Sequence, residues 1–336
     1  KNEFFNSNKN TFTIINCFKK LKKVYLIARI SKKKLKFKNK IGNTQIINLF
    51  KIFEIKNQIR KRKILIISLT PYNFLISYIL VILGVNKENM YLFLRSDGFQ
   101  EYSIKFGKMG GYIYASMLNL LEKRLNILSC STSLKGVHKS KLVFPSEITN
   151  EWLDNRKNQN KKIDLNKRIR LLYLGRLRKE KGCDDLIELF NQLKIKSSLT
   201  IVGNDFKYLK KKDYPINPNI RILGQVSSVK KLIQYYNNTD IFILPSYSEA
   251  FPQVILESFS RLKPVIIFNE IRFLKNMFSH GLFNCERNIK SLEKTIKKII
   301  KNYKYIQLDI LKSKIHSLKD FQIQMNDITQ KKRKLR

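Results

Sequence analysis

This sequence has few residues of the kinds that bind metal ions or form disulfides. It contains 4 cysteines and 3 histidines, and no two cysteines form a C-x-x-C pair. Neither a zinc ribbon nor a disulfide framework is indicated, and a reducing compartment fits this usage. The isolated histidines favour neither a histidine-rich metal site nor a Ser-His-Asp triad. An Asp-x-Asp motif is also absent, so we expect no metal and no cofactor.

Glycine, proline and acidic residues are scarce as well. The chain has 12 Gly and 7 Pro, which excludes collagen-like and low-complexity architectures. Because 43% of the 336 residues are hydrophobic, a disordered basic tail protein is excluded too. The length suits two domains. Against 67 Lys and Arg stand only 25 Asp and Glu, a formal net charge of +42.

The positive charge is concentrated near the two ends of the chain. Residues 4–53 contain 13 Lys or Arg and no acidic residue, and residues 331–336 are almost wholly basic. Such segments attract polyanions, and we expect peripheral contact with an anionic membrane. The alternative is a lysine bias of an AT-rich genome. Aromatic residues are not interleaved with the lysines, so no specific nucleic-acid partner is indicated.

One long apolar run could be mistaken for a membrane helix. Residues 64–85 carry no charge and reach the length of a membrane span. Pro71, Tyr72 and Asn73 interrupt this run, with a strand-like pattern before them and a helical pattern after them. We therefore favour a buried strand, a turn and a core helix. Charged and Asn residues interrupt residues 1–23, so we expect no signal peptide and a cytoplasmic protein, peripheral on the inner face of the membrane.

Strand and helix patterns alternate along the chain, which predicts an α/β fold with parallel sheets covered on both faces. In the first half the expected strands are 24–30, 63–69, 90–94, 127–130 and 141–144, and the expected helices are 41–59, 73–84 and 109–121. In the second half the expected strands are 170–174, 199–202, 220–223, 241–244 and 264–268, and the expected helices are 184–193, 229–236 and 252–261. Residues 155–166 are rich in Asn and Lys, and we predict a linker there between domains 1–154 and 167–336. The second domain would include a terminal helix and the basic tail.

Two loops at strand ends in the second domain carry charged residues, and in the first loop these lie between two glycines. The first follows strand 170–174 and places Arg176 and Lys181 between Gly175 and Gly182, where they could neutralise a diphosphate. The second follows strand 241–244. There, free backbone N–H groups at residues 251–254, just after Glu249, form an anion site at a helix start.

Further candidates accompany these two loops. Glu257 lies inside the helix that follows Glu249, and a carboxylate on an apolar helix face needs a partner; alone, it would read as a surface Glu. Gly203-Asn204-Asp205 and Gly224-Gln225-Val226 each follow an expected strand, and their backbone groups could hold a nucleobase. Two ordinary glycine turns are the alternative for that pair.

Taken together, these motifs resemble those of the retaining GT-B glycosyltransferases of family 4, the glycosyl transferases group 1. The resemblance covers residues 169–268 and rests on Tyr173-Leu174-Gly175-Arg176-Leu177 with Lys181-Gly182, on Asp240-Ile241-Phe242-Ile243-Leu244-Pro245-Ser246, and on the Glu249-x7-Glu257 spacing before Lys263-Pro264-Val265-Ile266. It implies a GT-B architecture, in which two Rossmann-like domains face each other across a cleft.

The resemblance also implies residue roles. Arg176 and Lys181 correspond to the pair that grips the diphosphate of a nucleotide sugar, Glu249 to the carboxylate that hydrogen-bonds the transferred sugar, and Glu257 to the one that holds the ribose. The backbone around the donor would be Gly175, Gly203, Gly224, Ala250 and Phe251. Ala250 stands where family members often have Gly, which narrows the approach beside the sugar.

The first half resembles the family less closely. Residues 41–44 are a reduced form of the expected glycine-rich loop. Asp97, in Arg95-Ser96-Asp97-Gly98, corresponds to a position where an acidic or His residue faces the cleft, and could orient the acceptor hydroxyl as a catalytic residue. The alternative is an ordinary Asp-Gly turn.

The predicted function is a retaining hexosyltransferase that moves a sugar from a nucleotide-diphosphate sugar to a glycan or lipid-linked acceptor in cell-surface polysaccharide synthesis. A related sugar-nucleotide epimerase is the alternative among enzymes, but three scattered histidines do not readily supply its acid and base. A basic nucleic-acid-binding protein and a catalytically silent scaffold are the alternatives outside that class.

Overall fold

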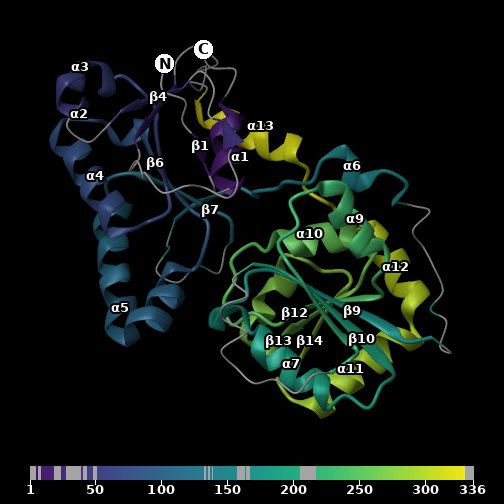
Figure 1. Cartoon of the computed structure of the whole chain (residues 1–336). Helices are drawn as coiled ribbons and strands as arrows, with labels where there is room; N and C mark the ends of the chain where they lie inside the picture. Colours follow the sequence, from purple (N-terminus) through teal and green to yellow (C-terminus); the bar gives the residue numbers. More distant parts are fainter. Residues whose placement is uncertain are drawn as a thin grey trace. The chain divides into compact units, whose positions relative to one another are not determined.

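A computed structural model shows two units, each built on a parallel sheet with helices (Figure 1). The structure describes residues 5–6, 9–18, 24–27, 39–40, 44–47, 51–131, 134, 137, 139–156, 163, 167–204 and 217–329. Unit 1 comprises Lys1–Glu147 and Leu318–Arg336, and unit 2 comprises Ile148–Ser317. Residues 32–38, 41–43 and 331–336, Asp205 and most of the expected linker lie outside the described residues.

Unit 1 is organised around the parallel sheet β5-β6-β7-β8. A second parallel pair is β2-β4, and β1-β3 is antiparallel. Its strands are β1 (Phe5–Asn6), β2 (Val24–Ile27), β3 (Asn39–Lys40), β4 (Thr44–Ile47), β5 (Ile64–Ile67), β6 (Met90–Leu94), β7 (Asn126–Ser129) and β8 (Lys141–Leu142). Its helices are α1 (Lys9–Cys17), α2 (Lys51–Glu54), α3 (Lys56–Ile59), α4 (Pro71–Ile82), η1 (Lys87–Asn89), α5 (Gly98–Glu122) and α13 (Leu318–Thr329).

The expected helix 41–59 is wrong. Strand β4 occupies its first half and pairs with β2, because Thr44, Ile46 and Ile47 include the β-branched residue types that fit a pleated strand. The second half forms two short helices, α2 and α3. They are separated at Ile55, whose φ of −103° and ψ of 19° are not helical.

The apolar run 64–85 forms a strand and a separate helix, as the breaker at Pro71 predicts. Strand β5 ends at Ile67, and α4 starts at Pro71 after Thr70, whose hydroxyl accepts a hydrogen bond from the Asn73 N–H at 3.1 Å. In the part of the chain that the structure describes, no helix combines the length and apolar character that crossing a membrane requires.

Unit 2 contains one six-stranded parallel sheet of order β11-β10-β9-β12-β13-β14. Strands β12 and β13 are buried along their whole length, as expected of central strands in a parallel sheet. Helices α7 and α11 lie on one face, and α9 and α10 lie on the other (Figure 1). The strands are β9 (Ile169–Leu174), β10 (Ser197–Val202), β11 (Ile220–Leu223), β12 (Ile241–Leu244), β13 (Val265–Phe268) and β14 (Leu282–Cys285). The helices are α6 (Asn150–Leu153), η3 (Lys179–Lys181), α7 (Cys183–Asn191), α9 (Val229–Asn237), α10 (Gln253–Ser260), η4 (Asn269–Asn276), α11 (Ile289–Lys301) and α12 (Tyr303–Lys312).

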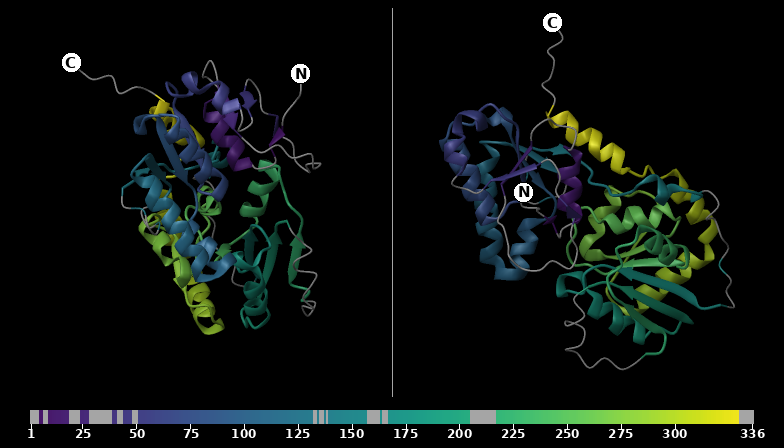
Figure 2. Two further views of the ribbon diagram at one scale, coloured as in Figure 1. Left: turned by 90° about the vertical axis from the view of Figure 1, so that its left-hand side faces the viewer. Right: turned by 45° about the horizontal axis from the view of Figure 1, so that its top comes forward.

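The last helix belongs to unit 1, although the sequence boundaries put it in the second domain. Helix α13 lies beside α1 (Figure 2). The Phe321 ring lies 6.3 Å from that of Phe93 in β6, and Gln324 accepts a hydrogen bond from the Phe144 N–H at 2.9 Å. The chain therefore returns from unit 2 to complete the core of unit 1.

Arg261, which follows α10, anchors the entry of the chain into unit 2. The residue is 3% exposed, and its guanidinium donates hydrogen bonds to Trp152 O at 3.1 Å, Asp154 O at 2.8 Å and Asn237 Oδ1 at 2.8 Å. Burial lowers its pKa, but the group stays charged at neutral pH because an arginine pKa starts so high. One side chain thus joins α6 and α9 to the end of α10.

We predict that Arg261→Ala lowers the free energy of unfolding of unit 2 by about 2–4 kcal/mol, because buried acceptors left without a donor cost about 1–3 kcal/mol each. Denaturant melts followed by the fluorescence of the single Trp, Trp152, measure this change. Arg272→Ala, at an exposed position of η4, is the matched control and should change stability by less than about 0.5 kcal/mol. Equal melts for the two variants would contradict this role.

Candidate active site

The strand order of unit 2 reverses direction between β9 and β12. From β9 the chain continues through β10 to β11 on one side, and then returns to β12, which pairs with β9 on the other side. In open α/β sheets, ligands bind beyond the carboxyl ends of the strands at such a switch point. The loops after β9 and β12 carry Arg176, Lys181 and Glu249.

Gly182 lets these two loops touch. Its φ is +62°, and a Cβ atom at this position would lie 2.1 Å from the Pro245 carbonyl oxygen. The left-handed conformation and the lack of space both require glycine. Close by, the Tyr247 N–H donates to Glu180 O at 3.0 Å, which ties the second loop to the first.

The first loop is also fixed to the neighbouring strand β10. The Gly175 N–H donates to Val202 O at 3.0 Å, and the Tyr173 hydroxyl donates to Arg176 O at 2.7 Å. Burial raises the pKa of Tyr173 well above its ordinary value, so the phenol remains a donor. Gly203 approaches so closely that a Cβ there would lie 2.1 Å from Gly175 O. Gly175 and Gly203 therefore support the loop's path.

Lys181 and Glu249 meet where the loops converge. The Lys181 Nζ lies 2.6 Å from Glu249 Oε1, and the Ser246 hydroxyl donates to the same oxygen at 2.7 Å. Their side chains are 16% and 14% exposed, so the pair is reachable from solvent yet largely shielded. Within the described ranges, both of these bonds go to Oε1 and none goes to Oε2. The second carboxylate oxygen can accept from a ligand hydroxyl.

The other residues predicted around the donor divide into exposed and buried ones. Arg176 is exposed at the start of the first loop, where its guanidinium can reach a ligand. Ala250 and Phe251 are buried, and the Phe251 ring packs 5.6 Å from that of Phe278. They hold the chain just before α10, which begins at Gln253 and points the positive end of its helix dipole toward this loop. Gly224 follows β11 and is exposed.

Glu257 has the partner that a carboxylate on an apolar helix requires. The Tyr236 hydroxyl donates to Glu257 Oε2 at 2.9 Å. Tyr236 is fully buried, and burial together with the nearby Glu257 carboxylate raises its pKa well above the ordinary value. The Tyr236 phenol therefore stays protonated, and its hydrogen bond orients the half-buried Glu257 carboxylate. Reading Glu257 as an unsupported surface residue does not fit this arrangement.

Asp97 lies in unit 1 and caps a helix. Its side chain accepts a hydrogen bond from the Gln100 N–H at 3.0 Å at the start of α5. This bond gives Asp97 a structural function in its own unit. The catalytic role expected for it stays a prediction.

Arg287, before α11, was not singled out from the sequence, yet it connects four segments of this site. Its guanidinium donates to Asp185 Oδ2 at 3.2 Å, Glu270 Oε1 at 2.9 Å and Pro245 O at 3.0 Å. Burial alone would raise the pKa of Glu270, but the hydrogen bond and charge of Arg287 outweigh it and lower that pKa. The Pro245 carbonyl, which lies against Gly182, thus also accepts a hydrogen bond from Arg287.

Two aromatic rings flank the same guanidinium. The Arg287 Cζ lies 4.0 Å from the centroid of Tyr247 and 4.4 Å from that of Phe268, distances typical of cation–π contact. The Tyr247 hydroxyl in turn donates to Asp185 Oδ2 at 2.6 Å, and burial and this bond raise the pKa of Tyr247 to about 12. In the sequence, Arg287 lies 17–102 residues from its hydrogen-bond partners, so no local pattern could reveal it.

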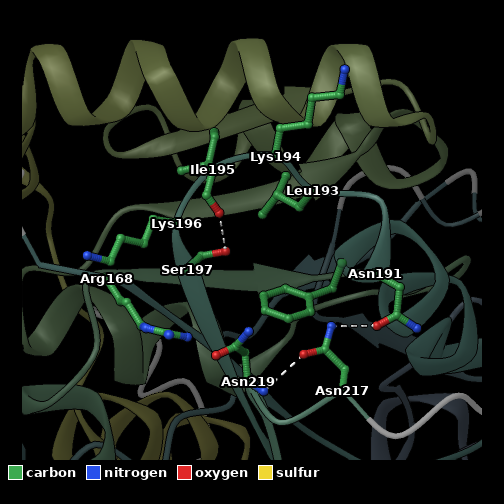
Figure 3. Close-up of a pocket in the computed structure, with 10 residues that line it drawn as sticks. Arg168, Asn191, Leu193, Lys194, Ile195, Lys196, Ser197, Asn217 and Asn219 are labelled. Carbon is green, nitrogen blue, oxygen red and sulfur yellow. Dashed lines mark hydrogen bonds between the residues drawn. The ribbon is translucent and has the colours of Figure 1, made fainter.

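A separate polar pocket of about 250 Å³ lies at the other end of the strands of this sheet, where β9, β10 and β11 begin (Figure 3). Arg168, Lys196 and Asn219 line it immediately before or at the amino ends of β9, β10 and β11. Asn217, bonded to Asn191 at 2.9 Å, closes one side. Because ligands of such sheets bind at the carboxyl ends of the strands, this pocket is not the candidate active site.

Among the residues that the structure describes, no three His, Cys, Asp or Glu side chains could hold a metal ion together.

Comparison with known families gives one match in this region. The sequence model of the family described as "Glycosyl transferases group 1" matches residues 154–310, which span most of unit 2. The candidate site lies within that range. Glycosyltransferase is therefore the enzyme class that the comparisons support, in agreement with the prediction.

Curated relatives match over shorter segments. The chain is 26% identical over 158 residues to an N,N'-diacetylbacillosaminyl-diphospho-undecaprenol alpha-1,3-N-acetylgalactosaminyltransferase of Campylobacter jejuni, covering 46% of this chain and 41% of that protein. It is 32% identical over 126 residues to the capsular polysaccharide biosynthesis glycosyltransferase CapM of Staphylococcus aureus, covering 35% and 32%. The chain thus spans less than half the length of either relative.

A solved structure matches nearly the whole chain. The HepE protein of Anabaena in complex with UDP superposes with a TM-score of 0.67 at 13% identity, covering 96% of each chain. This match confirms the predicted fold class, an α/β protein of GT-B type with two parallel-sheet units.

We predict that Arg287→Ala lowers the free energy of unfolding by about 2–4 kcal/mol, because it removes three hydrogen bonds, including those to the Glu270 carboxylate and the Pro245 carbonyl. Arg287→Lys should recover less than half of this loss, since an ammonium lacks the planar fork and ring stacking of a guanidinium. Denaturant titration measures both. Arg221→Ala, exposed on β11, is the control. A fully stable Arg287→Ala variant would refute the proposed structural role.

Proposed function

We propose that this protein is a glycosyltransferase that transfers a sugar from a nucleotide-diphosphate sugar to a glycan or lipid-linked acceptor during cell-surface polysaccharide synthesis. The observation that carries this proposal is the Lys181–Glu249 pair at the switch point of the second sheet, inside the matched family range. A cation for a phosphate and an acceptor for a hydroxyl stand next to each other there. Those are the two groups that a sugar diphosphate presents at its reacting end.

The diphosphate is bound by positive charge from three sources. Arg176 reaches it from the exposed start of the first loop, Lys181 from the end of that loop, and the positive end of the α10 helix dipole from the second loop. Negative charge grows on the phosphate oxygen as its bond to the sugar breaks. Preorganised donors at that position stabilise the transition state more than the ground state.

Two carboxylates hold the hydroxyl-rich rings. Glu249 Oε2 accepts from a hydroxyl of the transferred sugar, while Lys181 and Ser246 keep the other oxygen fixed. Glu257, oriented by the buried Tyr236 phenol, accepts from the ribose hydroxyls. The base lies beside the loops that follow β10 and β11, at Gly203 and Gly224. Ionised carboxylates accept only, so each ring hydroxyl is a suitable donor.

Transfer proceeds with retention at the anomeric carbon. The acceptor hydroxyl attacks C1 from the side that the diphosphate leaves; the C1–O bond to phosphate breaks as the new bond forms, and the hydroxyl proton passes to the departing phosphate oxygen. Lys181 already neutralises Glu249, which suits that carboxylate to binding a hydroxyl rather than to attacking C1. No step requires a metal ion.

Relatives supply the substrate classes. The superposed Anabaena structure contains UDP, and we take a uridine diphosphate sugar as the first donor to test. The name of the Campylobacter relative specifies an acceptor sugar on diphospho-undecaprenol, and the name of the Staphylococcus relative specifies capsular polysaccharide. A lipid-linked glycan is accordingly the acceptor class proposed here. Thermal shifts against a panel of nucleotide sugars identify the donor, because a ligand bound only by the native state stabilises it.

For catalysis, we predict that Glu249→Gln lowers kcat at least a hundredfold, since the amide no longer pairs with Lys181 or accepts from the sugar with full charge. Transfer of radiolabelled sugar to a lipid-linked glycan measures turnover. Glu188→Gln, exposed on α7, is the matched control and should keep its activity. Near-normal turnover by Glu249→Gln would show that this carboxylate does not act on the donor.

For binding, we predict that Arg176→Met and Lys181→Met each weaken the affinity for a nucleoside diphosphate by about 1.5–3 kcal/mol, the usual contribution of hydrogen bonds to charged groups. Calorimetry with UDP measures the loss, and Lys179→Met, exposed in the same loop, is the control. The Kd of uridine should stay unchanged in all three variants. An unchanged Kd for UDP in both test variants would rule out the diphosphate clamp.

A further inference from the structure

Helix α5 of unit 1 is a bent pair of arms rather than a straight rod. Gly107 has a φ of 72° and a ψ of −178°, which separates residues 98–106 from residues 108–122. The two arms fold back on each other: the centroids of the Phe99 and Tyr112 rings lie only 6.1 Å apart. In a straight helix, 13 residues would separate them by about 20 Å. Figure 1 shows the bend at the lower end of α5.

Glycines bring the two arms close together. A Cβ at Gly98 would lie 2.1 Å from Tyr114 Cζ, and one at Gly111 would lie 2.2 Å from Ser103 Oγ. Each glycine therefore faces a side chain of the opposite arm. The bend is built into the packing of unit 1 and presents residues 104–113 at its outer end.

Large apolar side chains are exposed at this bend. Five of them are between 46% and 71% exposed: Ile104, Phe106, Met109, Tyr112 and Ile113, which we call the apolar tip. Within the second arm, positions 109, 112 and 113 lie on one face at helical spacing, while Tyr114, Met117 and Leu118 are buried on the other. The second arm is thus apolar on both faces, and only one of these is covered by unit 1.

The two charged residues within the apolar tip are both lysines. Lys105 and Lys108 are exposed beside it, and Lys123 and Arg124 are exposed at the end of the second arm. No acidic residue occurs between Glu101 and Glu122. A surface that combines large apolar and aromatic side chains with lysines is typical of segments that lie in the interface of a bilayer.

We propose that the apolar tip of α5 docks this protein on an anionic lipid bilayer, with the apolar side chains among the acyl-chain boundaries and Lys105 and Lys108 at the phosphates. A second copy of the chain fits the surface less well, because self-pairing would bring the same lysines together in a protein of formal charge +42. The docking surface lies on α5 alone. Docking through α5 uses neither the donor site nor the lysines at residues 32–40.

Vesicle sedimentation tests the contribution of the apolar side chains. With vesicles of phosphatidylglycerol and phosphatidylcholine, the triple variant Phe106→Ser, Met109→Ser, Tyr112→Ser should bind at least tenfold more weakly than the unaltered chain. The control Tyr305→Ser, Leu308→Ser removes two exposed apolar side chains from α12 in unit 2 and should bind normally. Because all of these positions are exposed, both variants should fold. Unchanged binding by the triple variant would overturn the proposal.

The lysines should control the preference for anionic lipid. Lys105→Gln, Lys108→Gln should reduce binding to the anionic vesicles at low salt, since each basic residue near such a surface contributes to attraction. Binding of the unaltered chain should persist in part at high salt, because the apolar contact is not screened. Binding that disappears completely at high salt would assign docking to charge elsewhere and contradict insertion.

A fluorescent label locates the contact directly. All four native cysteines are buried, so Met109→Cys introduces a single accessible thiol for an environment-sensitive dye. Its emission should shift to the blue when anionic vesicles are added, whereas a dye on Tyr305→Cys should not shift. A shift that instead follows protein concentration without vesicles, together with a doubled mass in sedimentation, would identify a second copy as the occupant and overturn the proposal.

Discussion

The contact between Gly182 and the Pro245 carbonyl is the constraint on which the candidate site depends. It joins the loops after β9 and β12 at the one position where the strand order of unit 2 reverses. Lys181 immediately precedes Gly182, and Glu249 lies four residues after Pro245. Close approach of the two backbones therefore brings the two charged side chains to 2.6 Å. Any side chain at position 182 would separate the loops.

Two ion-pair systems meet at this contact, and their chemistry differs. Arg287 uses a planar fork between two aromatic rings to hold two carboxylates and a carbonyl, an arrangement suited to a permanent connection. Lys181 is a compact point charge with one carboxylate partner, so an incoming phosphate can share it. The first system holds the loops in place, and the second is available to a ligand.

Much of unit 2 was predictable from the sequence because its signals are local. Buried strands such as β12 read as continuous apolar runs, and the glycines and charged residues of the two loops follow them directly. The Lys181–Glu249 contact joins residues 68 positions apart and depends on the strand order of the sheet, which the sequence analysis did not predict. The Arg287 network and the Tyr236–Glu257 bond could not be predicted, because they join residues that are 17–102 and 21 positions apart.

Unit 1 was harder to predict for the same reason. Strand β4 lies in a segment whose apolar spacing also suits a helix, and pairing with β2 decides between the two. Helix α13 joins unit 1 from the far end of the chain, which no boundary in composition marks. The bend of α5 depends on glycines packed against the opposite arm, and a helical pattern alone does not reveal that fold-back.

A crystal structure of the protein with a uridine diphosphate sugar tests the central claim most directly. The account predicts density for the diphosphate within hydrogen-bond distance of Arg176 and Lys181, and a sugar hydroxyl on Glu249. Diphosphate bound instead at the amino edge of the sheet, beside Arg168 and Lys196, would contradict it.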